Sequence, residues 1–449
     1  MRAERANLLA CTGYATTTAQ PRRIIALTAA MAAFLYQEGP WQQAAALHQA
    51  AAAAARDYGD RLGEASALHD LGRVRYLTDD YPAAAGLQEQ ALAIYQDIGS
   101  RLGEASALHD LGRVRYLTDD YPAAASLQER ALGIYQDIGS RLGEANALHD
   151  LGRVRYLTGD YPAATGLQER ALGIYQDIGS RLGEANALHD LGRVRYATGD
   201  YPAAAGLLER ALGIYQDIGN RLGEATALNT LGRVRYLTGD YPAAAGLLER
   251  ALGIYQDIGS RVGEASVLNA LGCVRYLTGD YPAAAGLQER ALGIHQDIGN
   301  RLGEANVLHD LGRVRSLTGD YPAAAGLLER SVALFREVGD AQGEAEALNA
   351  TGALLAVSAG PREALAVYRH ALQLARQVGS PLEEAQALEG AARCMARTDD
   401  QAAARAGLSE AVAIYQRIGA AEAGPASADL AAMDKDVRDN DAVQESIVY

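Results

Sequence analysis

A serine, a histidine and an aspartate, the residue types of a hydrolytic triad, stand close together early in the chain. They are Ser66, His69 and Asp70. On a helix, His69 and Asp70 would point about 100° apart, so the carboxylate could not orient the imidazole. In a later copy of the same string, Asn146 replaces the serine. We therefore expect no triad.

Histidines recur at a fixed interval, and three cysteines are scattered along the chain. The residues are His69, His109, His149 and His189, and Cys11, Cys273 and Cys394. Histidines on equivalent helices roughly 10 Å apart cannot share one metal, since each ligand atom must come within about 2 Å of it. The cysteines show no CxxC spacing. We expect no metal, no cofactor and a reducing cytoplasm, with histidines that titrate near pH ~6.5.

Positive charge comes almost entirely from arginine. The only lysine, Lys435, lies near the carboxyl terminus. P-loop and Schiff-base mechanisms require a lysine in the site. Because triad and metal chemistry are also excluded, we expect that the chain is not an enzyme.

The composition indicates a folded, acidic protein. The 449 residues are 49% hydrophobic, and 41 basic against 56 acidic residues give a net charge of −15. This charge repels nucleic acid and anionic membranes, although a local basic groove is compatible with it. Arg22 and Arg23 precede an apolar run over residues 24–36. The run imitates an export signal, but a membrane span needs about 20 apolar residues, and we expect a cytoplasmic protein without a membrane partner.

The chain repeats itself every 40 residues. Residues 61–100 and 101–140 differ at three positions, and such a period is typical of solenoids and propellers. The divisions that we predict are a helical lead-in at 1–20, a divergent repeat at 21–60, seven near-identical repeats at 61–340, two divergent capping repeats at 341–420, and an acidic, partly disordered tail at 421–449.

Each repeat has the pattern of two helices. In the repeat at 141–180, the apolar positions of the first helix, helix A, are Ala145, Leu148, Leu151 and Val154. Asp160 is a suitable N-cap for a second helix, helix B, which ends at Gly179, and Ser180 caps the next helix A. Because no segment alternates with period two, propellers are excluded. The expected fold is all-α, a right-handed solenoid of about ten antiparallel helix pairs.

Two further features of the sequence, glycines inside helix B and a helix in the tail, are expected to have structural roles. Gly166 and Gly173 lie inside the expected helix B, where each costs up to about 1 kcal/mol relative to alanine. Close helix packing or drift of the duplicated repeat would explain them, and we assign them no function. In the tail, a short helix is expected from an N-cap at Ser427 to Val437, packed on the last repeat.

The repeat resembles the tetratricopeptide repeat over residues 21–420. The matching positions are Leu148, Leu151, Gly152, Gly159, Tyr161, Ala164 and Ala171. The period of 40 residues exceeds the usual 34 and is similar to the long repeats of Leu-Gly-Asn-rich spindle adaptors. It is more similar to the sensor arrays of bacterial signal-transduction ATPases of the STAND class. HEAT repeats lack the Leu-Gly and Gly-Asp-Tyr landmarks.

The string at residues 4–9 resembles the segment that precedes the repeats in AfsR-type actinobacterial regulators, which belong to the STAND class. This resemblance implies a sensor arm, with a STAND-type ATPase or regulator among its partners. The chain contains no GxxxxGK[ST] motif, so the resemblance does not supply the ATPase. Whether the chain stands alone or is the sensor fragment of a larger regulator stays open.

In this fold helix A lines the concave groove, so its polar residues off the apolar stripe are the candidates for binding a partner. They are Arg113, Arg153, Arg193 and Arg233; Tyr116, Tyr156, Tyr196 and Tyr236; His109, His149 and His189, with Asn229 in the same position; and Asn146 and Asn186. Arginine forms bidentate hydrogen bonds to carboxylate or phosphate, and tyrosine adds a flat amphipathic surface. We expect this arginine ladder to bind an extended acidic protein or peptide.

An alternative is that these arginines pair with acids of the same chain. Asp150 lies three residues before Arg153, and Glu169 or Asp177 could approach from helix B. Tyr156 suits packing against the neighbouring repeat equally well. Cys273 and Ser316 replace ladder residues in later repeats, where the ladder should weaken. The sequence leaves the two interpretations open.

The sequence favours a protein- or peptide-binding scaffold or sensor in bacterial signalling or transcriptional regulation. One alternative is a ligand-gated receptor for a peptide pheromone or a small molecule, whose superhelix changes pitch on binding. Another is an RNA-binding solenoid that uses the same arginines and tyrosines. The net charge of −15 argues against nucleic acid as the partner.

Overall fold

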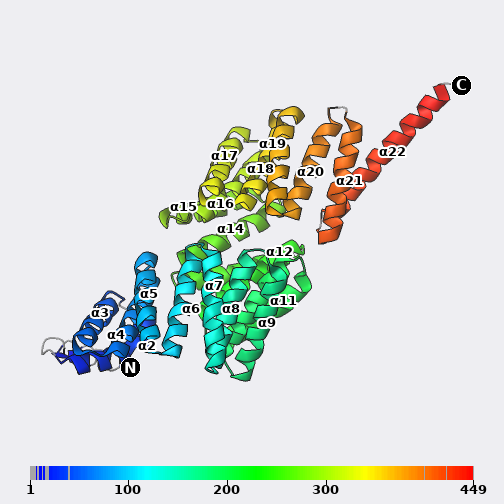
Figure 1. Ribbon diagram of the computed structural model, residues 1–449. Coiled ribbons are helices and arrows are strands. Elements are labelled where there is room, and N and C mark those ends of the chain that lie inside the picture. The colour runs from blue at the N-terminus through cyan, green and yellow to red at the C-terminus, as the bar shows by residue number, and fades with distance from the viewer. Residues whose placement is uncertain are drawn as a thin grey trace. The chain divides into compact units, whose positions relative to one another are not determined.

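The computed structural model describes residues 7, 10–12, 14, 15, 20–38, 41–398, 400–420 and 422–447. Every regular element in these ranges is a helix, and α2 to α21 form ten successive pairs (Figure 1). This confirms the all-α, solenoid class predicted from the repeat. The string at residues 4–9 and most of the lead-in at 1–20 lie outside the described residues, apart from the few named above.

The helices follow the 40-residue period closely. The A helices are α2 (Pro21–Glu38), α4 (Arg61–Leu77), α6 (Arg101–Leu117), α8 (Arg141–Leu157), α10 (Arg181–Ala197), α12 (Arg221–Leu237), α14 (Arg261–Leu277), α16 (Arg301–Leu317), α18 (Ala341–Ser358) and α20 (Pro381–Ala396). The B helices are α3 (Trp41–Tyr58), α5 (Tyr81–Asp97), α7 (Tyr121–Asp137), α9 (Tyr161–Asp177), α11 (Tyr201–Asp217), α13 (Tyr241–Asp257), α15 (Tyr281–Asp297), α17 (Tyr321–Val338), α19 (Pro361–Val378) and α21 (Gln401–Ile418).

The helices group into two compact units, residues 1–194 and residues 195–449, which we call the first unit and the second unit. In each unit successive helices pack together, and A helices also contact the next A helix. Such contacts join α4 to α6 and α6 to α8 in the first unit, and α12 to α14 and α14 to α16 in the second. We call the surface formed by the sixth, ninth, tenth, thirteenth and sixteenth residues of each repeat the A-helix face.

The caps explain most of the helix boundaries. The side chain of Asp160 accepts a hydrogen bond from the backbone N–H of Ala163 at the start of α9. Gly179 follows the end of α9 with φ +70°, a conformation that suits glycine. Ser140 occupies the N-cap position of α8 but accepts no capping hydrogen bond, whereas Asn220 accepts one at the start of α12. The expected serine cap is therefore not general among the repeats.

Glycines in helix A, rather than those in helix B, permit the close packing. A Cβ atom on Gly143 would lie 2.3 Å from Cδ1 of Tyr135 in the preceding repeat, and one on Gly152 would lie 2.7 Å from Nε2 of Gln168. A Cβ atom on Gly166 or Gly173 would meet nothing within 4 Å. Close packing as the reason for these two glycines was therefore wrong, because they face open space. Nothing else in the structure explains them.

The core is a series of layers shared between neighbouring repeats. Leu148 of α8 packs in one buried cluster with Ile174 and Tyr175 of α9 and with Ala187 of α10. Each fully buried large apolar side chain of this kind contributes about 1.5–3 kcal/mol. Each repeat thus depends on its neighbours for burial, which is how a solenoid is stabilised.

The last helix is longer than the sequence suggested. Helix α22 extends over Ala423–Ile447, beyond the expected end at Val437. Ser427 lies inside its first turns and donates a hydrogen bond from Oγ to the carbonyl oxygen of Ala423 at 2.6 Å, so Ser427 is not the N-cap. Ala426 and Leu430 pack against the last repeat, as expected for the start of this helix.

Candidate functional site

All the predicted partner-binding residues lie on the A-helix face, carried by α6, α8, α10 and α12. Their spacing of three or four residues places them on one side of each helix. Most are half-buried, His189 is buried, and Arg233 is exposed. The structure thus brings the predicted residues of successive repeats together on a single surface within each unit.

Arginine and tyrosine stack between neighbouring repeats of the first unit. The guanidinium of Arg113 lies 4.7 Å from the ring centroid of Tyr76, and that of Arg153 lies 4.6 Å from the ring centroid of Tyr116. Each also donates a hydrogen bond from Nη2 to the tyrosine hydroxyl at 3.1 Å. Such cation–π contacts contribute about 0.5–2 kcal/mol, depending on how far they are desolvated.

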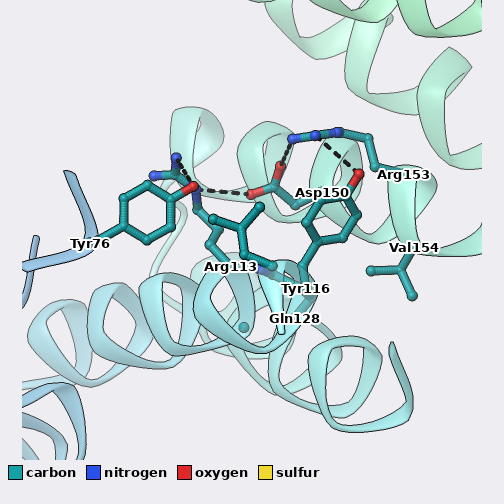
Figure 2. A pocket seen from close by; sticks show the side chains of 9 residues that line it. Tyr76, Arg113, Tyr116, Gln128, Asp150, Arg153 and Val154 are labelled. Atoms are coloured by element: carbon teal, nitrogen blue, oxygen red, sulfur yellow. Dashed lines mark hydrogen bonds and ion pairs between the residues drawn. The ribbon is translucent and has the colours of Figure 1, made fainter. Parts of the chain in front are cut away.

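Aspartates at the tenth position neutralise these arginines. Asp150 lies 3.7 Å from Nη1 of Arg153 in its own repeat and 3.9 Å from Nε of Arg113 in the preceding repeat. Nε2 of His109 also lies 3.4 Å from the same carboxylate. Figure 2 shows Asp150 between the two arginines, with Tyr76 and Tyr116 beside them. We call one arginine, the aspartates next to it and the tyrosine under it a rung.

The same arrangement recurs along the first unit. Asp190 lies 3.4 Å from Nη1 of Arg193 and 4.0 Å from Nε of Arg153, and Nε2 of His149 lies 3.4 Å from it. Burial raises the pKa of Asp190, but the neighbouring histidines and Arg193 outweigh burial and hold the pKa below its usual range. Asp190 is therefore ionised. Because each aspartate is shared between two successive arginines, the A-helix face of the first unit carries as many aspartates at the tenth position as arginines at the thirteenth.

The ladder arginines pair within the chain, as the alternative interpretation predicted, but Arg153 pairs with aspartates of A helices and not with an acid of helix B. Asp177 pairs with Arg141 at 3.6 Å, whereas Glu129 pairs with Arg155 at 3.1 Å. Arg153 is held by the aspartates of two successive A helices instead. The contact of Arg153 with Asp150 could be predicted because the two residues are three apart on one helix. Nothing in the sequence indicates the contact of Arg153 with Asp190 of the next repeat.

Glutamines on helix B orient the histidines, and sequence reasoning missed them. Nε2 of Gln128 donates to the carbonyl oxygen of His109 at 3.0 Å, so its Oε1 atom accepts from Nδ1 of His109 at 2.9 Å. Gln168 does the same for His149. This bond leaves Nε2 of each histidine to face the aspartate of the next repeat. Ser66 bonds to Tyr95 rather than to His69, so the triad residues do not assemble.

Pockets open between successive rungs. One shallow pocket is lined by Tyr76, Arg113, Tyr116 and Arg153, with Gly112 among its lining residues. Another shallow pocket is lined by Tyr36, Arg73, Tyr76, Arg113 and Gly72, the corresponding residues one repeat earlier. A Cβ atom on Gly112 would lie 2.7 Å from Nε2 of Gln128, so the glycine makes room for this glutamine at the edge of the pocket. The A-helix face therefore offers equivalent aromatic and charged pockets at the interval of one repeat.

The asparagines and the remaining tyrosines take other contacts. Asn146 accepts a hydrogen bond from the hydroxyl of Tyr175 at 2.8 Å, while Asn186 lies half-buried on α10. The Tyr156 ring packs against Tyr161, with 5.8 Å between the centroids, and lies under Arg193 at 4.5 Å. Tyr156 therefore combines packing with a place on the exposed face.

The rungs change in the second unit. Arg233 follows Thr230 instead of an aspartate, and the next repeat has Ala270 at the tenth position and Cys273 at the thirteenth. The Arg233 guanidinium lies 5.8 Å from the ring centroid of Tyr196. Tyr236 is half-buried, and burial raises its pKa. The arginine ladder is thus interrupted at Cys273, where the sequence predicted that it would weaken.

Two absences concern the ranges that the structure describes. Within them, no group of three or more histidine, cysteine, aspartate or glutamate side chains is arranged to hold a metal ion. No helix in the same ranges is long and apolar enough to cross a membrane.

The chain matches a known repeat family in sequence. The tetratricopeptide repeat profile matches residues 23–97, 103–177, 143–217, 183–257, 263–337 and 303–377. Together these matches cover more than half of the chain. No curated protein matches it in sequence.

Several solved structures share the fold. A Rap protein complexed with competence and sporulation factor has a TM-score of 0.60 and 15% identity, covering 81% of this chain and 99% of its own. The Rap conjugation regulator of plasmid pLS20, in complex with a Phr peptide, has a TM-score of 0.56 and 14% identity, covering 75% and 96%. A STAND protein with a tetratricopeptide repeat sensor, from Pyrococcus horikoshii, has a TM-score of 0.51 and 15% identity, covering 74% and 51%. At these identities the likeness concerns the fold alone.

Proposed function

Because the chain belongs to the tetratricopeptide repeat family, we propose that it is a non-enzymatic regulatory module that binds an extended protein or peptide along its A-helix face. Repeat solenoids use such continuous faces to hold their partners. Two of the fold neighbours are Rap proteins solved with competence and sporulation factor or with a Phr peptide. These neighbours support a peptide as the partner and bacterial regulation as the setting; we propose the cytoplasm as the location.

The observation that carries this proposal is the repeated pocket. The pockets around Gly72 and Gly112 have the same types of lining residue and lie one repeat apart. An extended chain that follows the A helices would meet a tyrosine and an arginine at each step. Tyrosine and arginine are the residue types that most often dominate binding energy at interfaces.

The partner that we propose is acidic, and a STAND-type regulator is one candidate. The arginines of the first unit already face aspartates, so their attraction for an acidic partner is partly offset. Each Nη atom carries a second N–H beyond the one directed at aspartate or tyrosine, and we propose that these N–H groups form charge-assisted hydrogen bonds to the partner. Because Arg73, Arg113 and Arg153 line the pockets, a partner would contact them even where charge contributes little.

The experiment is a binding assay on the full chain with matched variants. Labelled protein is applied to an array of random, end-capped decapeptides, and the strongest binders are measured in solution by fluorescence anisotropy. One variant changes Arg113, Arg153 and Arg193 to glutamine on the A-helix face. The control changes Arg130, Arg170 and Arg210 to glutamine, which are exposed on the B helices and alter the net charge equally.

We expect the A-helix variant to lose at least about tenfold in affinity, while the control binds as the wild type does. Circular dichroism confirms that both variants are folded. Equal binding by the two variants, or no binding by the wild type, would contradict the proposal. The radius of gyration, measured by X-ray scattering with and without peptide, distinguishes a passive scaffold from the ligand-gated alternative.

A further inference from the structure

A row of exposed leucines and isoleucines follows the turns that join each helix B to the next helix A in the first unit. Each turn has an isoleucine directly after the end of helix B and a leucine at the second residue of helix A. Their side chains are between 39% and 57% exposed. We call these residues the turn stripe: Ile98, Leu102, Ile138, Leu142, Ile178 and Leu182.

The fold does not require an apolar side chain at the second residue of helix A. Gln342 occupies this position in α18, where it is exposed. The leucines at the same position of α6, α8 and α10 therefore leave apolar surface in contact with water without being needed to form the helix. The corresponding row of the second unit is less regular, because it contains Val262 and Gln342. Contiguous exposed apolar groups mark surfaces that bind another macromolecule.

The area of the turn stripe suits a reversible protein interface. A leucine or isoleucine side chain has roughly 60–120 Å² of apolar surface to bury, so six that are about half exposed offer roughly 200–350 Å². A standard interface buries about 800 Å² on each partner, and somewhat more than half of this area is apolar. The stripe thus supplies roughly half of the apolar area that such an interface needs. Polar side chains beside it would supply the rest.

Opposite charges accompany the turn stripe in two rows. An arginine precedes each leucine at the start of helix A, and an aspartate precedes each isoleucine at the end of helix B. Nη2 of Arg101 lies 3.6 Å from Oδ2 of Asp137. Arg141 and Asp177 lie at the same distance. Because these side chains are half or more exposed, such pairs hold each other weakly, and both rows can pair with charges of a partner.

A second copy of this chain matches the turn stripe in spacing and in charge. Its own leucines and isoleucines recur at the interval of one repeat, so two stripes can stay in register over several repeats. When a two-fold axis runs along the stripe, the row at the start of the A helices in one copy faces the row at the end of the B helices in the other. Leucine then lies opposite isoleucine, and arginine lies opposite aspartate.

A lipid surface matches the turn stripe less well. The arginines are balanced by the aspartates, so the stripe has no excess of positive charge to attract anionic headgroups. The net charge of the chain, −15, adds repulsion.

We propose that the chain forms a two-fold symmetric dimer in which the turn stripe of the first unit packs against the same stripe of a second copy. The stripe uses the second and thirty-eighth positions of each repeat, and neither belongs to the A-helix face. The inference is therefore independent of the proposed function, and either can fail alone.

The test measures the mass of the full chain by sedimentation velocity over a range of protein concentrations. The wild type is compared with the double variant Leu102→Gln and Leu142→Gln, which follows the example of Gln342. The control, Leu117→Gln with Leu157→Gln, removes two exposed leucines at the opposite ends of the same two helices. Circular dichroism verifies that each protein is folded, and fluorescence anisotropy with the decapeptides reports peptide binding.

We expect a concentration-dependent dimer for the wild type and for the control. The dissociation constant of the dimer should be at least about tenfold higher for the stripe variant, because each substitution occurs in both copies. A wild type that is monomeric at every concentration, or equal weakening by the two double variants, would overturn the inference. A stripe variant that dimerises as the wild type does but loses peptide binding would also overturn it and would assign the leucines to the peptide.

A charge exchange tests the two-fold arrangement itself. One protein carries Arg101→Asp and Arg141→Asp, and the other carries Asp137→Arg and Asp177→Arg. In either protein alone like charges meet across the axis, whereas in an equimolar mixture opposite charges meet. We expect each protein alone to dimerise at least about tenfold more weakly than the wild type and the mixture to recover the dimer. A mixture that shows no recovery would overturn the pairing of the two stripes.

Discussion

The first and second units are built from the same helix pairs but treat the arginines of the A-helix face differently. In the first unit Arg153 is held between Asp150, Asp190 and Tyr116. In the second unit Arg233 retains only the tyrosine among these partners. The buried positions, such as Leu148 and Leu228, are kept in both units. Folding therefore depends on the layers between helices, while the exposed rung can change without altering the helix pair.

The difference between Arg233 and the paired arginines also shows how one position in a periodic array can become distinct from the others. Identical rungs give every step of the face the same charge and shape, so they cannot fix where along the face a partner stops. An interruption breaks this equivalence. Arg233 in the second unit therefore differs from Arg113, Arg153 and Arg193 of the first unit, each of which pairs with an aspartate.

The largest expected effect concerns another departure in the second unit, at Glu383. Other repeats have glycine at this position, for example Gly343 under the ring of Phe335. Glu383 is 5% exposed and accepts a hydrogen bond from Nδ2 of Asn349 at 3.1 Å. Burial, with a smaller contribution from Glu346, raises its pKa to about 7, although the hydrogen bond from Asn349 and the charge of Arg313 act in the opposite direction.

Because the folded pKa lies above the unfolded value, Glu383 contributes stability at low pH that is lost as the pH rises through about 7. We expect Glu383→Gln to be more stable than the wild type by about 2–3 kcal/mol at pH 8 and to differ little at pH 4.5. Urea unfolding at both values measures this. A matched control, Glu410→Gln, changes an exposed carboxylate and should show no such dependence; a constant difference would contradict the prediction.

The next effect breaks a rung of the first unit. Asp150→Asn leaves Arg113, Arg153 and His109 without their shared carboxylate, and we expect a loss of about 2 kcal/mol, because these groups are half-buried. The control Asp177→Asn removes an exposed partner of Arg141 and should cost less than about 0.5 kcal/mol. Urea midpoints provide the comparison, and equal midpoints would show that the rungs contribute nothing to stability.

A smaller effect comes from rebuilding the interrupted rung. Thr230→Asp together with Ala270→Asp would give Arg233 the two aspartates that Arg153 has. We expect a gain of up to about 1 kcal/mol in the free energy of unfolding, measured by urea unfolding. The control Thr238→Asp adds an exposed aspartate at the end of α12. A rebuilt protein that is no more stable than the wild type would show that the two aspartates do not stabilise Arg233.

The smallest effect separates the two kinds of tyrosine contact. Tyr116→Leu removes a ring that lies 4.6 Å from Arg153 and a hydroxyl that bonds to it, which should cost about 1 kcal/mol beyond the lost packing. Tyr196→Leu removes the looser contact at 5.8 Å and should cost about half as much. Thermal unfolding of the two variants measures the difference, and the reverse order would argue against tighter stacking in the first unit.

Much of the fold could be predicted because the same cap residues and apolar spacing recur in successive repeats. The N-cap at Asp160 and the helix end near Gly179 were confirmed, as was the antiparallel pairing. The prediction about the glycines was wrong because it considered helix B alone. Gly166 and Gly173 suggested close packing, but the close contacts are at Gly143 and Gly152 on helix A. The end of α22 was missed because its charged turns carry no apolar periodicity to mark where a helix stops.

The candidate site was only partly accessible from the sequence. The residue types on helix A and the contact of Asp150 with Arg153 follow from spacing within one helix. The contacts of Asp150 with Arg113 and His109 cross from one repeat to the next, and their existence depends on how repeats are stacked, which spacing does not encode. The binding role of the predicted residues, from Arg113 to Tyr236, stays a prediction.

The most direct test of the difference between the two units is the chemical reactivity of each arginine in the free protein. Phenylglyoxal modifies guanidinium groups, and mass spectrometry distinguishes Arg233, which follows Asn229 and Thr230, from Arg113 and Arg153, which follow histidine and aspartate. We predict that Arg233 is modified at least about fivefold faster, because no carboxylate holds it. Equal rates for the three arginines would contradict the distinction between balanced and interrupted rungs.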